Sequence, residues 1–375
     1  MKRSRSLLRS LHRWLGLVLL VPLLLQGLTG LLLIVGKPVD RALGRELFVV
    51  EPGQARRGLD AIHAGLVARF GDGASFVYRP PRADDESLIV HVDGTWHGRV
   101  FVDPYTGRLL GERKGTGAWF DWLFELHAEL LSGQAGRAVL AAAGLGGLLL
   151  IASGYWLWWP AGWSSAFRVQ PGAGQVRLLF DLHRVGGALA GLIIASSLLS
   201  GVYMAWRPVS GFVSAIAGEA PLVPPSLPAV AFEPPHRHLP SIDRLVAAAD
   251  LALPGGQPGY VEVPADPARP VRVRKRLPGE THPNGLSMVW LDPRTAEVLR
   301  VTRHDELDPG TRLYELMYPL HIGELGGATQ LLLTGISGAM LASLSVLGVC
   351  LWGARRPVPR SRRRSGEPAA GRRPR

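Results

Sequence analysis

The sequence predicts a membrane α-helical bundle of four spans, built as two parallel pseudo-repeats, with two small extracytoplasmic α+β modules. Three observations lead to this fold class: the apolar content, the distribution of charge and an internal duplication. Of the 375 residues, 47% are hydrophobic and only 19% are charged, which is more apolar sequence than one soluble core accommodates. We therefore expect a membrane protein.

Four runs without a charged residue are long enough to cross a bilayer as helices: 15–35, 138–159, 185–206 and 328–352. About 20 apolar residues are sufficient for a hydrocarbon core about 30 Å thick. The first run is long for the apolar part of a signal peptide, and no A-x-A cleavage site follows it. We therefore expect an uncleaved first span, and an even number of crossings that leaves both termini on one side.

The charge distribution predicts which side that is. Segments 1–14, 160–184 and 353–375 together hold 17 Lys or Arg and two acidic residues, whereas 37–135 and 207–325 each hold 12 basic and 14 acidic residues. This asymmetry is the positive-inside pattern, so both termini are expected in the cytoplasm. The formal net charge of +12 thus reflects topology, and no nucleic-acid partner is expected. The basic tail is expected to be disordered and to contact lipid headgroups.

Matching residues at constant spacing indicate the duplication. The first and third spans match at an offset of 171, in the pairs Leu11/Leu182, His12/His183, Arg13/Arg184, Gly16/Gly187, Leu28/Leu199 and Gly30/Gly201. The second and fourth spans match at an offset of 194, in the pairs Leu126/Leu320, His127/His321, Leu131/Leu325, Gly133/Gly327, Gly144/Gly338, Gly154/Gly348, Leu157/Leu351 and Trp158/Trp352. Such parallel repeats are related by an axis along the membrane normal.

The expected organisation follows from the spans and the duplication. It comprises a cytoplasmic N-terminus with span 1 (1–36), periplasmic module 1 (37–135), span 2 with a cytoplasmic loop and span 3 (136–206), periplasmic module 2 (207–325), span 4 (326–352) and a basic cytoplasmic tail (353–375). A Pro-rich linker, 221–240, precedes the folded part of module 2.

Each periplasmic module is predicted to be one helix on an antiparallel sheet. In module 1 we expect a helix over 58–70, strands over 75–78, 88–92 and 99–103, and a turn over 103–107. In module 2 we expect a helix over 242–253, strands over 260–263, 271–273 and 287–291, and a turn over 292–295, in which Ala296 replaces the glycine of the first turn.

The layout resembles the PepSY-associated transmembrane proteins and, within them, the inner-membrane reductases of ferric siderophores. The resemblance is carried by Leu11-His12-Arg13 with Leu28-Thr29-Gly30, Leu126-His127 with Gly154 and Leu157-Trp158, Asp181 to Arg184 with Ser200-Gly201, Pro319 to His321 with Leu351-Trp352, and the strand-turn segments 100–107 and 289–293. It implies PepSY-like periplasmic modules, haem b held by histidines, and electron transfer to periplasmic ferric siderophores at the bacterial inner membrane.

Four histidines are candidate haem ligands on independent grounds. A b-type haem needs two axial ligands on opposite faces, neutral imidazole is a good iron ligand, and helical bundles hold cofactors between facing helices. His12 and His183 lie at the cytoplasmic ends of spans 1 and 3, and His127 and His321 lie just before spans 2 and 4. We expect two haems, one near each membrane surface. Gly16 and Gly187 follow the first pair by four residues and would leave room for a macrocycle.

The other chemical groups have ordinary expected roles. His63 is expected on a helix surface, and His91, His97, His282 and His304 in strands or loops. The pair His236 and His238 is weak evidence for a metal site, and Cys350 is expected to pack in the bundle. The basic strand Arg272, Arg274, Lys275 and Arg276 is expected to be a solvated edge strand, with attraction of an anionic chelate as the alternative.

The partners and the alternatives follow from what the chain contains. It has no dinucleotide-binding G-x-G-x-x-G after a strand, no P-loop and no C-x-x-C-H motif, so any haem is non-covalent and electrons come from a separate flavoprotein or quinol. Two other functions remain open: a membrane sensor or scaffold whose modules bind a peptide or protein, and a siderophore transport component without redox chemistry. The colour of the purified protein distinguishes the first function from these two.

Overall fold

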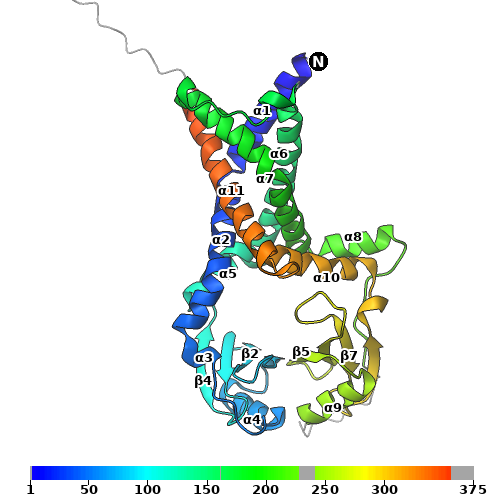
Figure 1. The fold of residues 1–375 in the computed structure, drawn as a ribbon. Helices are drawn as coiled ribbons and strands as arrows, with labels where there is room; N and C mark the ends of the chain where they lie inside the picture. Colours follow the sequence, from blue (N-terminus) through cyan, green and yellow to red (C-terminus); the bar gives the residue numbers. More distant parts are fainter. Residues whose placement is uncertain (1, 161, 228–240, 356–375) are drawn as a thin grey trace, which may run out of the picture.

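The computed structural model describes residues 2–160, 162–227 and 241–355. A helical bundle forms one end of the molecule and a β-sheet forms the other (Figure 1). The amino-terminal helix and the end of the last helix lie at the bundle end away from the sheet (Figure 1). Most of the predicted linker 221–240 and of the basic tail 353–375 lies outside the described residues.

Within the described residues, four helices are long and apolar enough to cross a membrane: α2 (Leu20–Leu43), α6 (Gly133–Trp158), α7 (Gln175–Ala205) and α11 (Gly327–Ala354). They coincide with the four predicted runs, so the prediction of a multi-pass helical membrane protein is confirmed. The first span differs in detail, because α1 (Lys2–Val18) ends inside the predicted run and α2 continues to Leu43. Backbone hydrogen bonds continue across the break, since Leu23 N donates to Leu19 O at 3.0 Å.

The bundle is held by close packing between helices that are far apart in the sequence. Helix α2 packs on α11, α6 packs on α7, α7 also packs on α11, and α1 packs on α6. The backbones of α2 and α11 approach closely, since a Cβ added to Gly338 would lie 2.8 Å from the carbonyl oxygen of Gly27. Glycine at such crossings lets membrane helices approach closely and gain van der Waals contact.

Two short helices, α5 (Trp119–Glu129) and α10 (Pro309–Ile322), precede α6 and α11, and the sequence reasoning did not separate them from the adjacent segments. Helix α5 ends in a turn with left-handed backbone at Leu130 (φ 51°) and Leu131 (φ 56°). Helix α10 begins with Asp308 as its N-cap, which accepts from Thr311 N at 3.1 Å, and ends at Gly323 (φ 80°).

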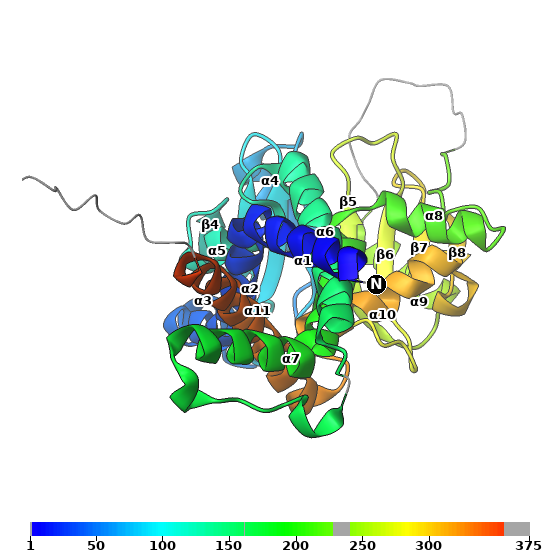
Figure 2. The ribbon, with the colours of Figure 1, turned by 90° about the horizontal axis from the view of Figure 1, so that it is seen from above.

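Helix α8 (Pro208–Ile216) fixes the start of α10. Ser214 Oγ donates to Asp308, and Gly310 N donates to Ser214 Oγ at 3.0 Å. Tyr203, near the end of α7, donates from its hydroxyl to Gly310 O at 2.6 Å. Seen from above, α8 and α10 lie together to one side of the bundle, over β7 and β8 (Figure 2). The end of α7 is thereby joined to the helix that carries His321.

The strands form one eight-stranded sheet of order β4-β3-β2-β1-β5-β6-β7-β8, in which every neighbouring pair is antiparallel. Its strands are β1 (Ser75–Arg79), β2 (Leu88–Asp93), β3 (Gly98–Val102), β4 (Leu109–Lys114), β5 (Gln257–Val263), β6 (Val271–Arg276), β7 (Ser287–Leu291) and β8 (Val298–Thr302). The sequence predicted six of them and missed β4 and β8.

The two predicted modules therefore do not form separate sheets. Strand β1 of the first segment pairs with β5 of the second, with Phe76 opposite Val263 and Tyr78 opposite Val261. Each segment alone would leave the edge of β1 or β5 with unpaired backbone N–H and C=O groups, and pairing the two edges satisfies both.

One face of the sheet carries the apolar core and the helices α4 (Leu59–Phe70) and α9 (Ile242–Ala252), which lie on the side away from the bundle (Figure 1). The two helices cap one another: Asp243 accepts from Leu59 N at 2.7 Å, and Asp60 accepts from Ile242 N at 2.5 Å. Carboxylates at helix N-termini satisfy free N–H groups and the helix dipole. These reciprocal caps reinforce the β1–β5 junction.

The remaining short elements and the two predicted turns complete the fold. The short elements are α3 (Arg45–Phe48), η1 (Trp163–Ser165), η2 (Pro171–Ala173) and η3 (His304–Glu306). Ala296 takes a left-handed conformation (φ 62°) close to that of Gly107 (φ 74°) in the first turn, so the hairpin keeps its geometry without glycine. Cys350 is exposed on α11, so the expectation that it packs inside the bundle is wrong.

We predict that Gly338→Ala destabilises the bundle, because its methyl group would lie 2.8 Å from Gly27 O and 3.2 Å from Leu31 N. Overpacking of this kind costs about 1–3 kcal/mol. Gly335→Ala, one turn earlier on α11, is the matched control, since its methyl group would meet Leu31 Cδ1 only at 3.8 Å. Thermal unfolding in detergent should show a lower midpoint for Gly338→Ala alone, and equal midpoints would contradict the packing analysis.

Candidate functional site

His12 and His183 face one another at the bundle end away from the sheet. His12 lies on α1 and His183 on α7, and their ring centroids are 6.4 Å apart with an interplanar angle of 83°. Each ring lies beside a glycine of another helix: a Cβ on Gly154 would be 3.5 Å from His12 Cε1, and one on Gly348 would be 3.6 Å from His183 Cε1. Helices α1, α6, α7 and α11 thus all contribute to this pair.

His127 and His321 form the corresponding pair at the bundle end next to the sheet. They lie on α5 and α10, and their ring centroids are 6.1 Å apart with an interplanar angle of 43°. A Cβ on Gly30 would be 3.2 Å from His127 Cε1, and one on Gly201 would be 3.1 Å from His321 Cε1. A side chain at either glycine would therefore displace the imidazole.

The spacing of both pairs fits a metal between the rings. A metal–imidazole nitrogen bond is about 2 Å and a ring centroid lies about 1 Å behind its nitrogen, so two imidazoles on opposite sides of one metal have centroids about 6 Å apart. The separations of 6.4 and 6.1 Å match this value. Two axial imidazoles are one of the ways in which proteins hold a b-type haem.

Hydroxyl groups determine which nitrogen carries the proton in His127 and His321, the pair next to the sheet. Thr29 Oγ1 donates its proton to Leu25 O at 2.7 Å, so it accepts the hydrogen bond from His127 Nδ1 at 2.8 Å. His127 is therefore protonated on Nδ1, and the lone pair of Nε2 is free for a metal. Such outer hydrogen bonds orient metal-bound histidines and raise their basicity.

Ser200 does the same for His321. Its Oγ donates to Ser196 O at 2.8 Å and accepts from His321 Nδ1 at 3.0 Å. The Nδ1 atom also lies 3.1 Å from the carbonyl oxygen of Ser197, which can only accept. Thr29 and Ser200 are in register at the offset of 171, directly before Gly30 and Gly201. The repeated spacing therefore contained a signal for these hydroxyls that the sequence prediction did not use.

In the pair away from the sheet, only His12 has a hydroxyl partner for its Nδ1 atom. Ser153 Oγ donates to Leu150 O at 3.0 Å and accepts from His12 Nδ1 at 2.8 Å. The position that matches Ser153 at the offset of 194 is Leu347. The buried Nδ1 of His183 accordingly has no hydroxyl partner within the described part of the chain.

A cavity of about 1070 Å³ opens beside His12 and His183. Its walls include Gly16 and Gly187, and a Cβ on Gly187 would meet nothing within 4 Å. Five arginines also line it: Arg5, Arg9, Arg13, Arg184 and Arg355. Paired imidazoles, apolar walls and arginines for the two carboxylates of the macrocycle are the groups that a b-type haem needs, so the residues present fit it.

The two pairs are separated by about the thickness of a membrane core. His183 and Gly201, which packs against His321, are 18 positions apart on the unbroken helix α7, or roughly 27 Å at about 1.5 Å per residue. The hydrocarbon core is about 30 Å thick. One pair therefore lies near each end of the apolar part of the bundle.

Residues 9–355 match the family described as the PepSY-associated TM region. The chain belongs to the PepSY-associated transmembrane family. A comparison with curated proteins finds no match. Family membership and the four apolar helices make this chain a multi-pass membrane protein.

The other histidines of this PepSY-associated protein do not form a metal site within residues 2–160, 162–227 and 241–355, where no group of three or more His, Cys, Asp or Glu side chains gathers. His236 and His238 lie outside these ranges. His63 is not a surface residue as expected, because it is half-buried and its Nδ1 lies 2.6 Å from the Tyr78 hydroxyl. His91 lies in β2 and His97 and His282 lie in loops, as expected, whereas His304 begins the 3-10 helix η3.

The basic strand β6 lies inside the sheet between β5 and β7, so the expectation of a solvated edge strand is wrong. Arg272 pairs with Glu262 at 2.5 Å and Lys275 with Asp250 at 2.6 Å. Arg274 and Arg276 have no carboxylate within ion-pair distance in the described chain. Of the four basic residues, Arg272 and Lys275 are thus paired with carboxylates, and Arg274 and Arg276 are not.

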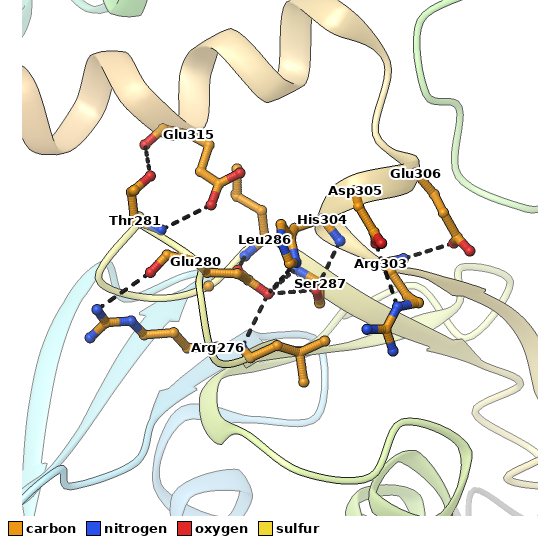
Figure 3. Close-up of polar contacts among 12 residues, drawn as sticks. Arg276, Glu280, Thr281, Leu286, Ser287, Arg303, His304, Asp305, Glu306 and Glu315 are labelled. Carbon is orange, nitrogen blue, oxygen red and sulfur yellow. Dashed lines mark hydrogen bonds and ion pairs between the residues drawn. The ribbon is translucent and has the colours of Figure 1, made fainter.

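The loop between β6 and β7 fastens the sheet to α10, as Figure 3 shows. Its centre is the buried carboxylate of Glu280, which accepts from Leu277 N at 3.1 Å and from Leu286 N at 2.5 Å. Thr281 N then donates to Glu315 Oε1 of α10 at 3.0 Å. The sequence offered no signal for this contact, because both carboxylates are ordinary polar residues in their local patterns.

Proposed function

We propose that this protein is a transmembrane haem b electron conduit that reduces periplasmic ferric siderophores and so releases Fe(II). The observation that carries the proposal is the geometry of the two histidine pairs. Each pair has the ring separation of two axial ligands, 6.4 and 6.1 Å, and the pairs lie near opposite ends of the apolar bundle. Bound haem b would supply one-electron transfer at each position.

The protein's own contribution is to hold the ligands in the required protonation state. The hydroxyl oxygens of Thr29, Ser200 and Ser153 accept hydrogen bonds from Nδ1 of His127, His321 and His12, respectively. Because each hydroxyl has already donated its own proton to a backbone carbonyl, the tautomer is fixed before any ligand binds. The glycines beside the rings keep side chains out of the space that a planar macrocycle needs.

The charge distribution supports the proposed orientation in a bacterial inner membrane. The bundle end that carries α1, the α6–α7 loop and the end of α11 is the end where basic residues concentrate, so we place both termini in the cytoplasm. His12 and His183 would then lie on the cytoplasmic side, within reach of a flavoprotein or quinol donor. His127 and His321 would lie on the periplasmic side, next to the sheet.

The proposed substrate follows from the chemistry of iron. Siderophores bind Fe(III) through hard oxygen donors that hold Fe(II) far more weakly. One electron from the donor, passed across the membrane, converts bound Fe(III) to Fe(II) and leaves the chelator intact. A conduit whose outer histidine pair lies beside an extramembrane sheet is suited to this reaction.

We further propose that the chain is a duplication of two parallel pseudo-repeats, each with a PepSY-like module. The reciprocal caps of α4 and α9 and the equivalent roles of Thr29 and Ser200 support this. The alternative function, a sensor or scaffold that binds a partner on its modules, is supported by the direct contact of Thr281 with Glu315, which joins the sheet to α10. Siderophore transport without redox chemistry has no such support.

We predict that the protein purified from membranes contains about two b-type haems per chain. His12→Ala and His183→Ala should each lose the same haem, and His127→Ala and His321→Ala should each lose the other, because one axial ligand of the pair is removed. Pyridine haemochrome assays and reduced spectra measure both. His97→Ala is the control, since His97 is exposed and its side chain contacts Asp93, far from either histidine pair in the sequence. Full haem content in all four variants would refute the ligand assignment.

We also predict that ferric siderophores reoxidise the reduced protein. After reduction by limiting dithionite without oxygen, addition of a ferric hydroxamate or a ferric carboxylate chelate should restore the oxidised spectrum and yield Fe(II), trapped by ferrozine. His127→Ala should slow this step while the remaining haem still accepts electrons from dithionite. If the wild-type protein stays reduced with every ferric siderophore, the sensor or scaffold function replaces the reductase.

A further inference from the structure

The face of the sheet that is turned toward the bundle carries a row of polar side chains across its two central strands. Tyr260 on β5 lies opposite Arg274 on β6. On the other side of β5, Tyr78 lies opposite Val261, which brings the next residue of β1, Arg79, beside Tyr260. Arg82 follows in the loop after β1 and interacts electrostatically with both Arg79 and Tyr260. Three arginines thus gather around one tyrosine at the middle of the sheet.

These three arginines have no carboxylate within ion-pair distance among the described residues, unlike several other basic residues of the sheet. Arg272, Lys275 and Arg99 pair with Glu262, Asp250 and Asp121, respectively. Arg79 and Arg274 are half-buried and Arg82 is exposed, so the cluster is open to an anion from solution. Such an anion would offset the cost of partly withdrawing the first two cations from water.

Arg274 shows the lack of compensation most clearly. Its Nη2 donates to the carbonyl oxygen of Gly285, its guanidinium lies 5.5 Å from the centroid of the Tyr260 ring, and its Nε is buried without a hydrogen-bond partner. The Arg82 guanidinium donates to the neutral side-chain oxygen of Asn284, and it interacts at longer range with the carboxylates of Glu324 and Glu86. The side chain of Arg79 forms no hydrogen bond or ion pair with another residue that the structure describes.

One neighbouring histidine is affected by the arginines. Burial, followed by the charges of Arg274, Arg82 and Arg276, lowers the pKa of His282 to about 3. The His282 imidazole is therefore neutral at physiological pH, and it does not add to the charge that an anion would meet.

The arginine cluster is held close to the helix that carries His321. His282 stacks on Tyr318 of α10, with ring centroids 4.7 Å apart, and Tyr318 lies one helical turn before His321. The same loop is fixed by Glu280 and by the bond from Thr281 to Glu315, both visible in Figure 3. An anion bound at the cluster would thus lie on the side of the sheet that faces the His127 and His321 pair.

We propose that Arg79, Arg82 and Arg274 form the binding site for a net-negative iron(III) chelate with free carboxylates, of the hydroxycarboxylate class. The guanidinium group presents paired N–H donors that match a carboxylate in a bidentate manner. Tyr260 and Tyr318 add aromatic surface and hydroxyl donors. This inference rests on the proposed reductase function and names the substrate class for it.

The same arginines would also attract the phosphate of an anionic lipid. Three observations favour the soluble chelate: the cluster lies on the inner strands β1 and β6 and the loop after β1, it lies under α10, and its aromatic neighbours form part of the site. The binding measurement separates the two sources by varying the lipid around the full-length protein.

The test uses gallium(III) dicitrate, which has the charge and shape of the iron complex but accepts no electron under these conditions. Binding to the full chain in phosphatidylcholine nanodiscs is followed by isothermal titration calorimetry, with a neutral gallium(III) trihydroxamate as the comparison ligand. We expect the dicitrate complex to bind about 10-fold or more tightly than the neutral complex, and its affinity to fall with added NaCl.

Arg79→Gln, Arg82→Gln and Arg274→Gln should each weaken dicitrate binding about 10-fold and leave binding of the neutral complex unchanged. Arg300→Gln is the matched control, because it removes one charge from the exposed edge strand β8, where the Arg300 guanidinium donates to Val223 O. It should change affinity less than about 2-fold. Arg82→Gln and Arg79→Gln alter side chains that are not buried, so circular dichroism should show them folded even if Arg274→Gln is not.

Equal affinity for the two gallium complexes, or unchanged dicitrate affinity in Arg79→Gln and Arg82→Gln, would overturn the inference. So would loss of dicitrate binding when phosphatidylglycerol replaces phosphatidylcholine, because the site would then be a lipid headgroup site. Reduction of a neutral ferric trihydroxamate at wild-type rate by the arginine variants, without any dicitrate binding, would leave the reductase function standing and refute this site alone. Arginine-dependent dicitrate binding by a protein purified without haem would support the site and refute the reductase.

Discussion

Four imidazoles held in two facing pairs inside an apolar bundle are the constraint on which the rest of the structure depends. A buried polar ring is stable only if its nitrogen atoms find partners. The hydroxyls of Thr29, Ser200 and Ser153 satisfy one nitrogen of three of these rings. The other nitrogen keeps a free lone pair. The ring centroids of each pair are 6.4 and 6.1 Å apart, which is the separation of two imidazoles that bind one metal from opposite sides. Gly30, Gly154, Gly201 and Gly348 lie directly beside the four rings and leave room for them.

The extramembrane sheet takes part in this arrangement. Helix α10 is fixed from two directions: Asp308 at its start is bonded to Ser214 of α8, and Glu315 in its middle is bonded to Thr281 of the sheet. The position of His321 therefore depends on contacts made outside the apolar bundle. A ligand bound on the bundle-facing side of the sheet would contact the same loop and helix and so would lie near the His127 and His321 pair.

The spans and the histidine pairs were predictable from the sequence because both rest on local or repeated signals. Uncharged runs of more than 20 residues are distinctive, and His12 with His183 and His127 with His321 recur at constant offsets. Thr29 and Ser200 recur at the same offset of 171. Their role could not be predicted, because the sequence does not show which imidazole each hydroxyl contacts.

Other features depend on contacts between distant segments. The pairing of β1 with β5 joins residues almost 200 positions apart, and no local pattern distinguishes an edge strand that stays free from one that finds a partner. For that reason β6 was predicted as an edge and is central. The separation of α5 from α6 depends on left-handed backbone at Leu130 and Leu131, which leucine rarely adopts and which composition therefore does not predict.

Electron transfer across a sealed bilayer tests the central claim most directly. The protein is reconstituted into vesicles that contain a ferric chelate and ferrozine, and a membrane-impermeant reductant is added outside. Molecules with the amino terminus outward should produce the Fe(II)–ferrozine colour inside, and the colour should be absent with His12→Ala and with His127→Ala, since each interrupts one of the two pairs. Internal Fe(II) formation no faster than in vesicles without protein, or undiminished in both variants, would contradict the account.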